Sequence, residues 1–153
     1  MKIFKQAKLA ALTLVCVSMS TTIFAGTSLS ALNTSSLKTL VAKAPTPATK
    51  EKVATTLNAK LPLIVEPGAT LKKVEYSNNF KLTVFMTDKT ANKYSSDETD
   101  SLNRFVVEKI HPFYCGVFKQ SKAAYKPDLY VDLVDKKGQS YFGSSESYND
   151  VCQ

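Results

Sequence analysis

The sequence predicts an α+β domain with one disulfide bond: an antiparallel sheet of about four strands, in two hairpins, with one or two helices packed on one face. Two stretches of alternating apolar and polar residues, 70–87 and 129–146, predict the hairpins. Between them, residues 95–110 carry apolar side chains at helical spacing, which predicts a helix. Cys115 and Cys152 follow that helix and the last strand, and they predict the disulfide bond.

The beginning of the chain has the pattern of a secretory signal peptide. Residues 1–25 hold three early lysines, no acidic residue and an apolar stretch, Leu9 to Val17, that is too short to span a bilayer. We expect cleavage between Ala25 and Gly26 rather than retention as an anchor. The mature chain is then periplasmic or secreted, without a direct membrane span.

Composition limits the classes of function. The chain has 153 residues, 44% of them hydrophobic, and a formal net charge of +7, which is typical of one globular domain. Part of that charge leaves with the signal peptide, and an exported protein rarely meets nucleic acid. We therefore expect no nucleic-acid partner.

The cysteine count supports the disulfide. Cys16 lies in the signal peptide, so the mature chain keeps Cys115 and Cys152. An even number in an oxidising compartment predicts one bond, which would stabilise the fold by roughly 3.5–4 kcal/mol. A redox or metal-binding pair is the alternative. It is disfavoured because the spacing is not C-x-x-C and a single histidine does not complete a zinc site.

Residues 26–49 are rich in Ser, Thr and Ala and end in two prolines, which predicts a flexible arm before a single domain at 50–153. The alternative is one weak amphipathic helix through its apolar residues. Those residues are Leu29, Leu32, Leu37, Leu40 and Val41. The domain should open with a helix over 48–60, capped by Thr46 or Thr49 and ended by Pro62.

The first hairpin should follow the turn at Pro67-Gly68. Simple alternation in its first strand, 70–77, places Val74 and Tyr76 on one face and Leu71, Lys73 and Glu75 on the other. Its second strand, 80–87, should bury Phe80, Leu82, Val84 and Met86.

The central helix should begin at a capping box formed by Ser95 and Glu98, and Pro112 should end or kink it. In the second hairpin, 129–134 and 139–146 flank a turn at 135–138, where Gly138 supplies the positive φ.

No catalytic set is evident. His111 is the only histidine, and a helix end suits it to interact with carbonyls or the helix dipole. Glu66, Glu75 and Asp132 are the candidates for paired carboxylates, a minor hypothesis of glycoside hydrolysis. We expect no enzyme, no cofactor and no metal.

Charged and aromatic residues of the two hairpins indicate a candidate partner-binding surface. Lys72, Lys73 and Lys81 belong to the first hairpin, and Tyr130 and Tyr141 belong to the second. A basic face with rigid aromatic side chains suits an acidic partner. The alternatives are an ordinary solvated strand face for the lysines and core packing for the tyrosines.

The order of these features over residues 50–152 resembles the disulfide-containing pilotins of type II secretion systems. The resemblance rests on the helix ending at Leu61-Pro62, the strand through 82–84, the helix running to Cys115, the segment 130–138 and the terminal Cys152. It implies partner binding through a groove between sheet and helix that holds a helical tail of the outer-membrane secretin. It also implies a lipid anchor, from which this sequence departs because Val15 precedes Cys16 where a small residue is needed.

The leading hypothesis is a non-enzymatic periplasmic protein-binding module, an adaptor or assembly factor for an envelope or secretion complex, whose partner is another envelope protein. The alternative is a periplasmic inhibitor or immunity protein that blocks a toxin or hydrolase through the loop 88–95.

Overall fold

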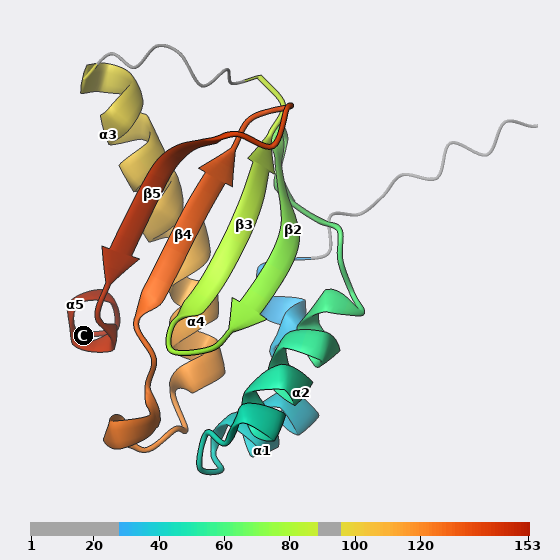
Figure 1. Ribbon diagram of the computed structural model, residues 1–153. Coiled ribbons are helices and arrows are strands. Elements are labelled where there is room, and N and C mark those ends of the chain that lie inside the picture. The colour runs from blue at the N-terminus through green and yellow to red at the C-terminus, as the bar shows by residue number, and fades with distance from the viewer. Residues whose placement is uncertain (1–27, 89–95) are drawn as a thin grey trace, which may run out of the picture.

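The computed structural model describes residues 28–88 and 96–153. A five-stranded sheet in the order β1-β2-β3-β4-β5 has helices α3 and α4 behind it, and none of the described helices covers the front of β3 and β4 (Figure 1). The strands are β1 Leu63–Glu66, β2 Ala69–Tyr76, β3 Phe80–Met86, β4 Leu129–Val134 and β5 Ser140–Glu146. The helices are η1 Leu29–Leu32, α1 Ser35–Val41, α2 Pro47–Asn58, α3 Ser96–Phe105, η2 Val106–Ile110, α4 His111–Phe118, η3 Ala123–Tyr125 and α5 Tyr148–Val151. The predicted signal peptide and its cleavage site, Ala25 and Gly26, lie outside the described residues.

The α+β class is confirmed, but the fully antiparallel arrangement is wrong. Strands β3 and β4 run parallel, from Phe80 beside Leu129 to Phe85 beside Val134. Parallel neighbours need a long crossover connection, and α3, η2 and α4 supply it. The fifth strand is β1, which pairs antiparallel with β2 and forms an edge of the sheet.

A bulge changes which side chains of β2 face the core. The register shifts between Leu71 and Lys73, so Leu71 and Val74 are both buried instead of lying on opposite faces.

Beyond the part of β2 that pairs with β1, the side chain of Asn58 in α2 makes the backbone hydrogen bonds that a neighbouring strand would make. Its side chain accepts a hydrogen bond from the Val74 N–H at 2.9 Å and donates one to the Val74 carbonyl at 2.7 Å.

The central helix does not end at Pro112 but continues to Phe118. Immediately before the proline the helix widens into the π turn η2, in which the His111 N–H donates to the Val106 carbonyl. A proline ring in regular α-helix collides with the carbonyl four residues earlier, and the wider turn accommodates it. Ser95 of the predicted capping box lies outside the described residues.

Three local predictions are confirmed. Helix α2 begins at Pro47, and the Thr46 hydroxyl accepts a hydrogen bond from the Thr49 N–H at 3.2 Å. Strand β3 buries every second residue, as its alternation predicts. The turn after β4 has Gly138 at φ +77°, which glycine adopts without a steric penalty.

Residues 28–41 differ from the predicted flexible arm. Leu29, Leu32, Leu37 and Val41 are all at most 7% exposed and belong to the main core. The Ser121 hydroxyl donates a 2.7 Å hydrogen bond to the Val41 carbonyl and joins the end of α1 to the segment after α4. The amphipathic alternative describes these residues better, because burial depends on the spacing of apolar side chains more than on average composition.

The core centres on Phe80, the first residue of β3. Its ring lies 5.0 Å from that of Phe118, 6.1 Å from Tyr114 and 6.5 Å from Phe113, between ring centroids. Each aromatic pair adds about 0.5–1.5 kcal/mol beyond the burial of its area. The Tyr114 hydroxyl donates to the Pro127 carbonyl, and burial raises the pKa of this phenol above its usual value.

The disulfide joins Cys115 of α4 to Cys152, directly after α5, with the two Cα atoms 5.5 Å apart. It therefore attaches the end of the chain to the helical layer.

We expect Leu37→Ala to lower the free energy of unfolding by about 2–5 kcal/mol, because a fully buried leucine leaves a cavity. Thr39→Ala, at an exposed position of the same helix, is the control and should change it by less than about 0.5 kcal/mol. Urea unfolding measures both. A Leu37→Ala protein as stable as the parent would contradict the packing of residues 28–41.

For the disulfide, we expect no reaction with a thiol reagent when residues 26–153, purified without reductant, are denatured. Replacing both Cys115 and Cys152 by serine should lower the free energy of unfolding by about 4 kcal/mol, as the loop entropy for a separation of 37 residues indicates. Two reactive thiols per chain would show that the bond is absent.

Candidate functional site

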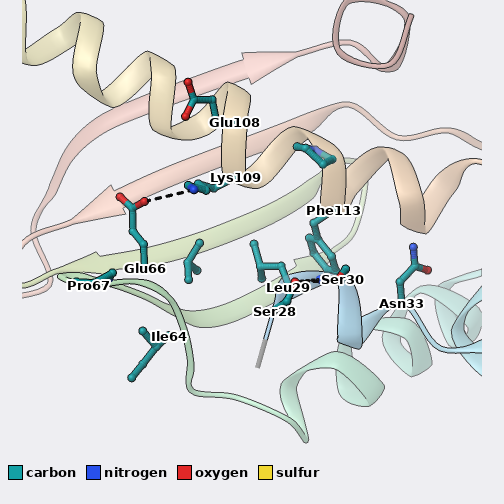
Figure 2. A pocket seen from close by; sticks show the side chains of 12 residues that line it. Ser28, Leu29, Ser30, Asn33, Ile64, Glu66, Pro67, Glu108, Lys109 and Phe113 are labelled. Atoms are coloured by element: carbon teal, nitrogen blue, oxygen red, sulfur yellow. Dashed lines mark hydrogen bonds and ion pairs between the residues drawn. The ribbon is translucent and has the colours of Figure 1, made fainter. Parts of the chain in front are cut away.

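A groove of about 730 Å³ lies between edge strand β1, the short helix η1 and the helical segment of η2 and α4 (Figure 2). We call it the β1 groove. It is lined by Ser28, Leu29, Ser30, Asn33, Ile64, Val65, Glu66, Pro67, Glu108, Lys109, Pro112 and Phe113. Three elements far apart in the sequence thus form one surface.

The apolar part of the groove is formed by Leu29, Ile64, Val65 and Phe113, with Pro112 beside them. Ile64 is 51% exposed, although its neighbour Leu63 in β1 is buried in the core. Fully burying a large aliphatic side chain stabilises by about 1.5–3 kcal/mol relative to full exposure, and the half-exposed Ile64 forgoes roughly half of that. An exposed apolar side chain inside a hollow is therefore a candidate anchor for a partner.

The polar part contains Glu66, Glu108 and Lys109. The Lys109 ammonium reaches toward Glu66, with 4.0 Å between nitrogen and oxygen, and Glu108 precedes it in the same π turn (Figure 2). The side chains of Lys109 and Glu66 are 44% and 36% exposed, and an ion pair of this kind contributes little to stability.

A smaller hollow of about 310 Å³ continues the groove along the helix. It shares Glu66, Pro67, Glu108 and Lys109 with the β1 groove. It extends to Asp88, after β3, and to Arg104 of α3. From residue 101 to 113 the helix spans roughly 18 Å, the length of several residues of a bound segment.

The five predicted partner-binding residues lie away from this groove. Lys72 and Lys81 place their ammonium groups over the rings of Phe85 and Tyr130, at 5.3 and 5.1 Å from the ring centroids. Tyr141 packs against the hydrophobic core. The structure thus brings Lys81 and Tyr130 together on the sheet, and it leaves Tyr141 apart from them.

The carboxylates of this sheet face neutralise its lysines. Lys73 pairs with Glu75 at 2.9 Å, and Lys81 pairs with Asp132 at 3.1 Å. The Ser140 hydroxyl also donates to Asp132, at 2.6 Å. The predicted basic face is therefore a mixed one, and partner binding by its lysines stays a prediction.

The candidates for chemistry are dispersed. Glu66 lines the β1 groove, whereas Glu75 and Asp132 pair with lysines on the sheet, so the three form no common site. His111 lies inside the continuous helix rather than at its end. Its Nε2 is 3.2 Å from a carboxylate oxygen of Glu146 at the end of β5, and its side chain is 12% exposed. This contact joins helix to sheet.

Sequence reasoning missed the groove residues Ile64, Lys109 and Phe113. Ile64 belongs to a short apolar run, 63–65, from which no strand was predicted. Lys109 lines the groove from the π turn, which the helical pattern alone does not predict. The contact loop proposed for the inhibitor hypothesis, 88–95, falls outside the described residues except for Asp88.

No protein-family profile and no curated protein sequence matches the chain. Among solved structures it is similar to the pilotin from the Vibrio vulnificus type 2 secretion system, EpsS. The sequence identity is 17%, the TM-score is 0.49, and the match covers 77% of this chain and 93% of that chain.

We expect Asp132→Asn to lower the pKa of Lys81. The hydrogen bond from Lys81 to Asp132 is the main reason that this pKa lies above 10.5. Because folding raises it, the contribution to stability is complete below about pH 10.5 and is lost as the pH rises through the folded-state pKa. It should be under about 1 kcal/mol, since the Lys81 side chain is 36% exposed.

NMR titration of labelled lysine side chains checks this expectation. Glu75→Gln should lower the same pKa by less, because the attraction of Glu75 is the smallest of the causes that raise it. A Lys81 pKa that Asp132→Asn leaves unchanged would contradict the contact.

Proposed function

We propose that the chain is a non-enzymatic protein-binding module of the cell envelope, an adaptor or assembly factor that holds a segment of another envelope protein in the β1 groove. The observation that carries this proposal is the half-exposed Ile64 in a hollow whose other apolar walls are Leu29, Val65 and Phe113. Leu29 and Phe113 are already buried and shape the hollow, so the gain comes from Ile64 and Val65. Burying the exposed parts of these two side chains against a partner releases the free energy that their contact with water forgoes.

The form of the groove favours a peptide segment as the occupant. A sheet edge and a helix side that leave an apolar hollow between them are a common arrangement for binding an extended or helical segment. Small-molecule sites typically place several polar groups around one point. Here the apolar side chains of β1, η1 and α4 lie beside a charged stretch that continues along the helix.

The location in the envelope follows from the signal peptide pattern and the disulfide. In this proposal residues 1–25 direct export, and the bond between Cys115 and Cys152 forms in the oxidising compartment. None of the helices in the described part of the chain has the length and apolarity that crossing a bilayer requires. The resemblance of the sequence to pilotins favours a secretion complex as the setting.

We expect Ile64→Asp to reduce recovery of the partner at least about tenfold, because a carboxylate in the apolar contact loses hydration without gaining a partner. The measurement is affinity purification from cross-linked envelope fractions of the source organism, with the partner quantified relative to the bait. Val107→Asp is the matched control. Val107 is 55% exposed on the helix and does not line the groove, so its replacement should leave recovery unchanged.

Thermal unfolding of both variants verifies that each remains folded. Equal recovery by the parent, Ile64→Asp and Val107→Asp, or the absence of a stoichiometric partner from all three, would count against the proposal.

A further inference from the structure

We infer that the segment held by the β1 groove combines an apolar side chain with a lysine or arginine. The apolar side chain packs on Ile64 and Val65, and the cation binds the carboxylates of Glu66 and Glu108. This inference rests on the proposed function and specifies the chemistry of the partner.

The charges that line the groove are unbalanced. Glu66 and Glu108 contribute two carboxylates, and Lys109 contributes the only ammonium group among its lining residues. The adjoining hollow shares these three residues, and its own Asp88 and Arg104 cancel each other, so the excess of one carboxylate is unchanged. The wall is therefore acidic in a chain whose formal net charge is +7, and it attracts a cation rather than an anion.

The hydrogen-bonding groups show the same imbalance. Glu108 makes no ion pair with a described residue, and the Asn33 Oδ1 is buried without a hydrogen-bond partner in the described part of the chain. A single hydrogen bond of 2.7 Å joins the Ser28 and Ser30 hydroxyls. Carboxylate and amide oxygens only accept hydrogen bonds, so a partner that brings donors satisfies them.

The contact between Glu66 and Lys109 yields readily to such a cation. Its 4.0 Å separation is the longest among the ion pairs of the described residues, whose other separations are 2.9, 3.1 and 3.2 Å. Both side chains are more than a third exposed, so releasing Lys109 to water costs little. The bound segment would exclude water from the groove and strengthen the new charge pair.

The π turn η2 positions the charged side chains of Glu108 and Lys109. Glu108 and Lys109 are consecutive, and both line the groove and the adjoining hollow. They lie in η2, immediately before His111 and Pro112. A basic side chain at the boundary between the two hollows would therefore meet Glu66 and Glu108 while its apolar neighbour reaches Ile64.

The sheet face that carries Lys72, Lys73 and Lys81 is a weaker candidate for a charged partner. Two of the three lysines already pair with Glu75 and Asp132. An acidic segment bound there is the rival outcome that the experiment must distinguish.

The test selects binders from a phage-displayed library of random 16-residue peptides on the purified mature chain. We expect the selected peptides to combine apolar residues with at least one lysine or arginine. For a selected synthetic peptide, fluorescence anisotropy should show affinity at least about tenfold lower for the double variant Glu66→Gln/Glu108→Gln, and binding that weakens as salt increases.

Two further variants sharpen the comparison. Glu75→Gln, which removes a carboxylate from the sheet face, is the matched control and should leave affinity unchanged. Lys109→Gln should tighten binding, because it removes the ammonium that competes for Glu66.

The outcomes separate this inference from the proposed function. Selected peptides that bind in an Ile64-dependent way but lack basic residues, or whose affinity the double variant does not change, would overturn the charge preference and leave the groove as the binding site. If no peptide loses binding in Ile64→Asp, the groove is not the binding site and both proposals fail. Selection of acidic peptides would likewise overturn the charge preference.

Discussion

The packing of Phe80 against the aromatic side chains of helix α4 is the contact on which the rest of the structure depends. Phe80 begins β3 and is fully buried, and its ring contacts Phe113 and Tyr114 in one turn of the helix and Phe118 in the next. The helix lies on one face of the sheet because it buries these rings there. It also serves as the crossover that allows β3 and β4 to run parallel.

The groove is a consequence of this arrangement. Pro112 lies inside a helix that buries apolar side chains both before and after it. The π turn before the proline makes room for its ring, so both parts of the helix can pack on the sheet. Glu108 and Lys109 line the groove from this turn, beside edge strand β1. The packing of η1 on α4 adds Leu29 as the third wall.

The sheet face and the β1 groove therefore differ in how many of their charged and apolar groups lack a contact within the described part of the protein. On the sheet face that carries Lys72, Lys73 and Lys81, the last two lysines pair with carboxylates, and Lys72 and Lys81 lie over aromatic rings. In the β1 groove, Ile64 is half exposed and Glu108 has no ionic partner among the described residues. Specific recognition favours the second surface, because contacts absent from the free protein supply the free energy of binding.

The sequence by itself determined the elements that depend on neighbouring residues. The cap at Thr46, the alternation through β3 and the turn at Gly138 all follow from interactions a few positions apart, and the pairing of Cys115 with Cys152 follows from their number. Only the tertiary structure decided the parallel pairing of β3 with β4, the bulge in β2, the packing of residues 28–41 and the groove. Each of these depends on contacts between segments far apart in the chain, which periodicity within one segment does not encode.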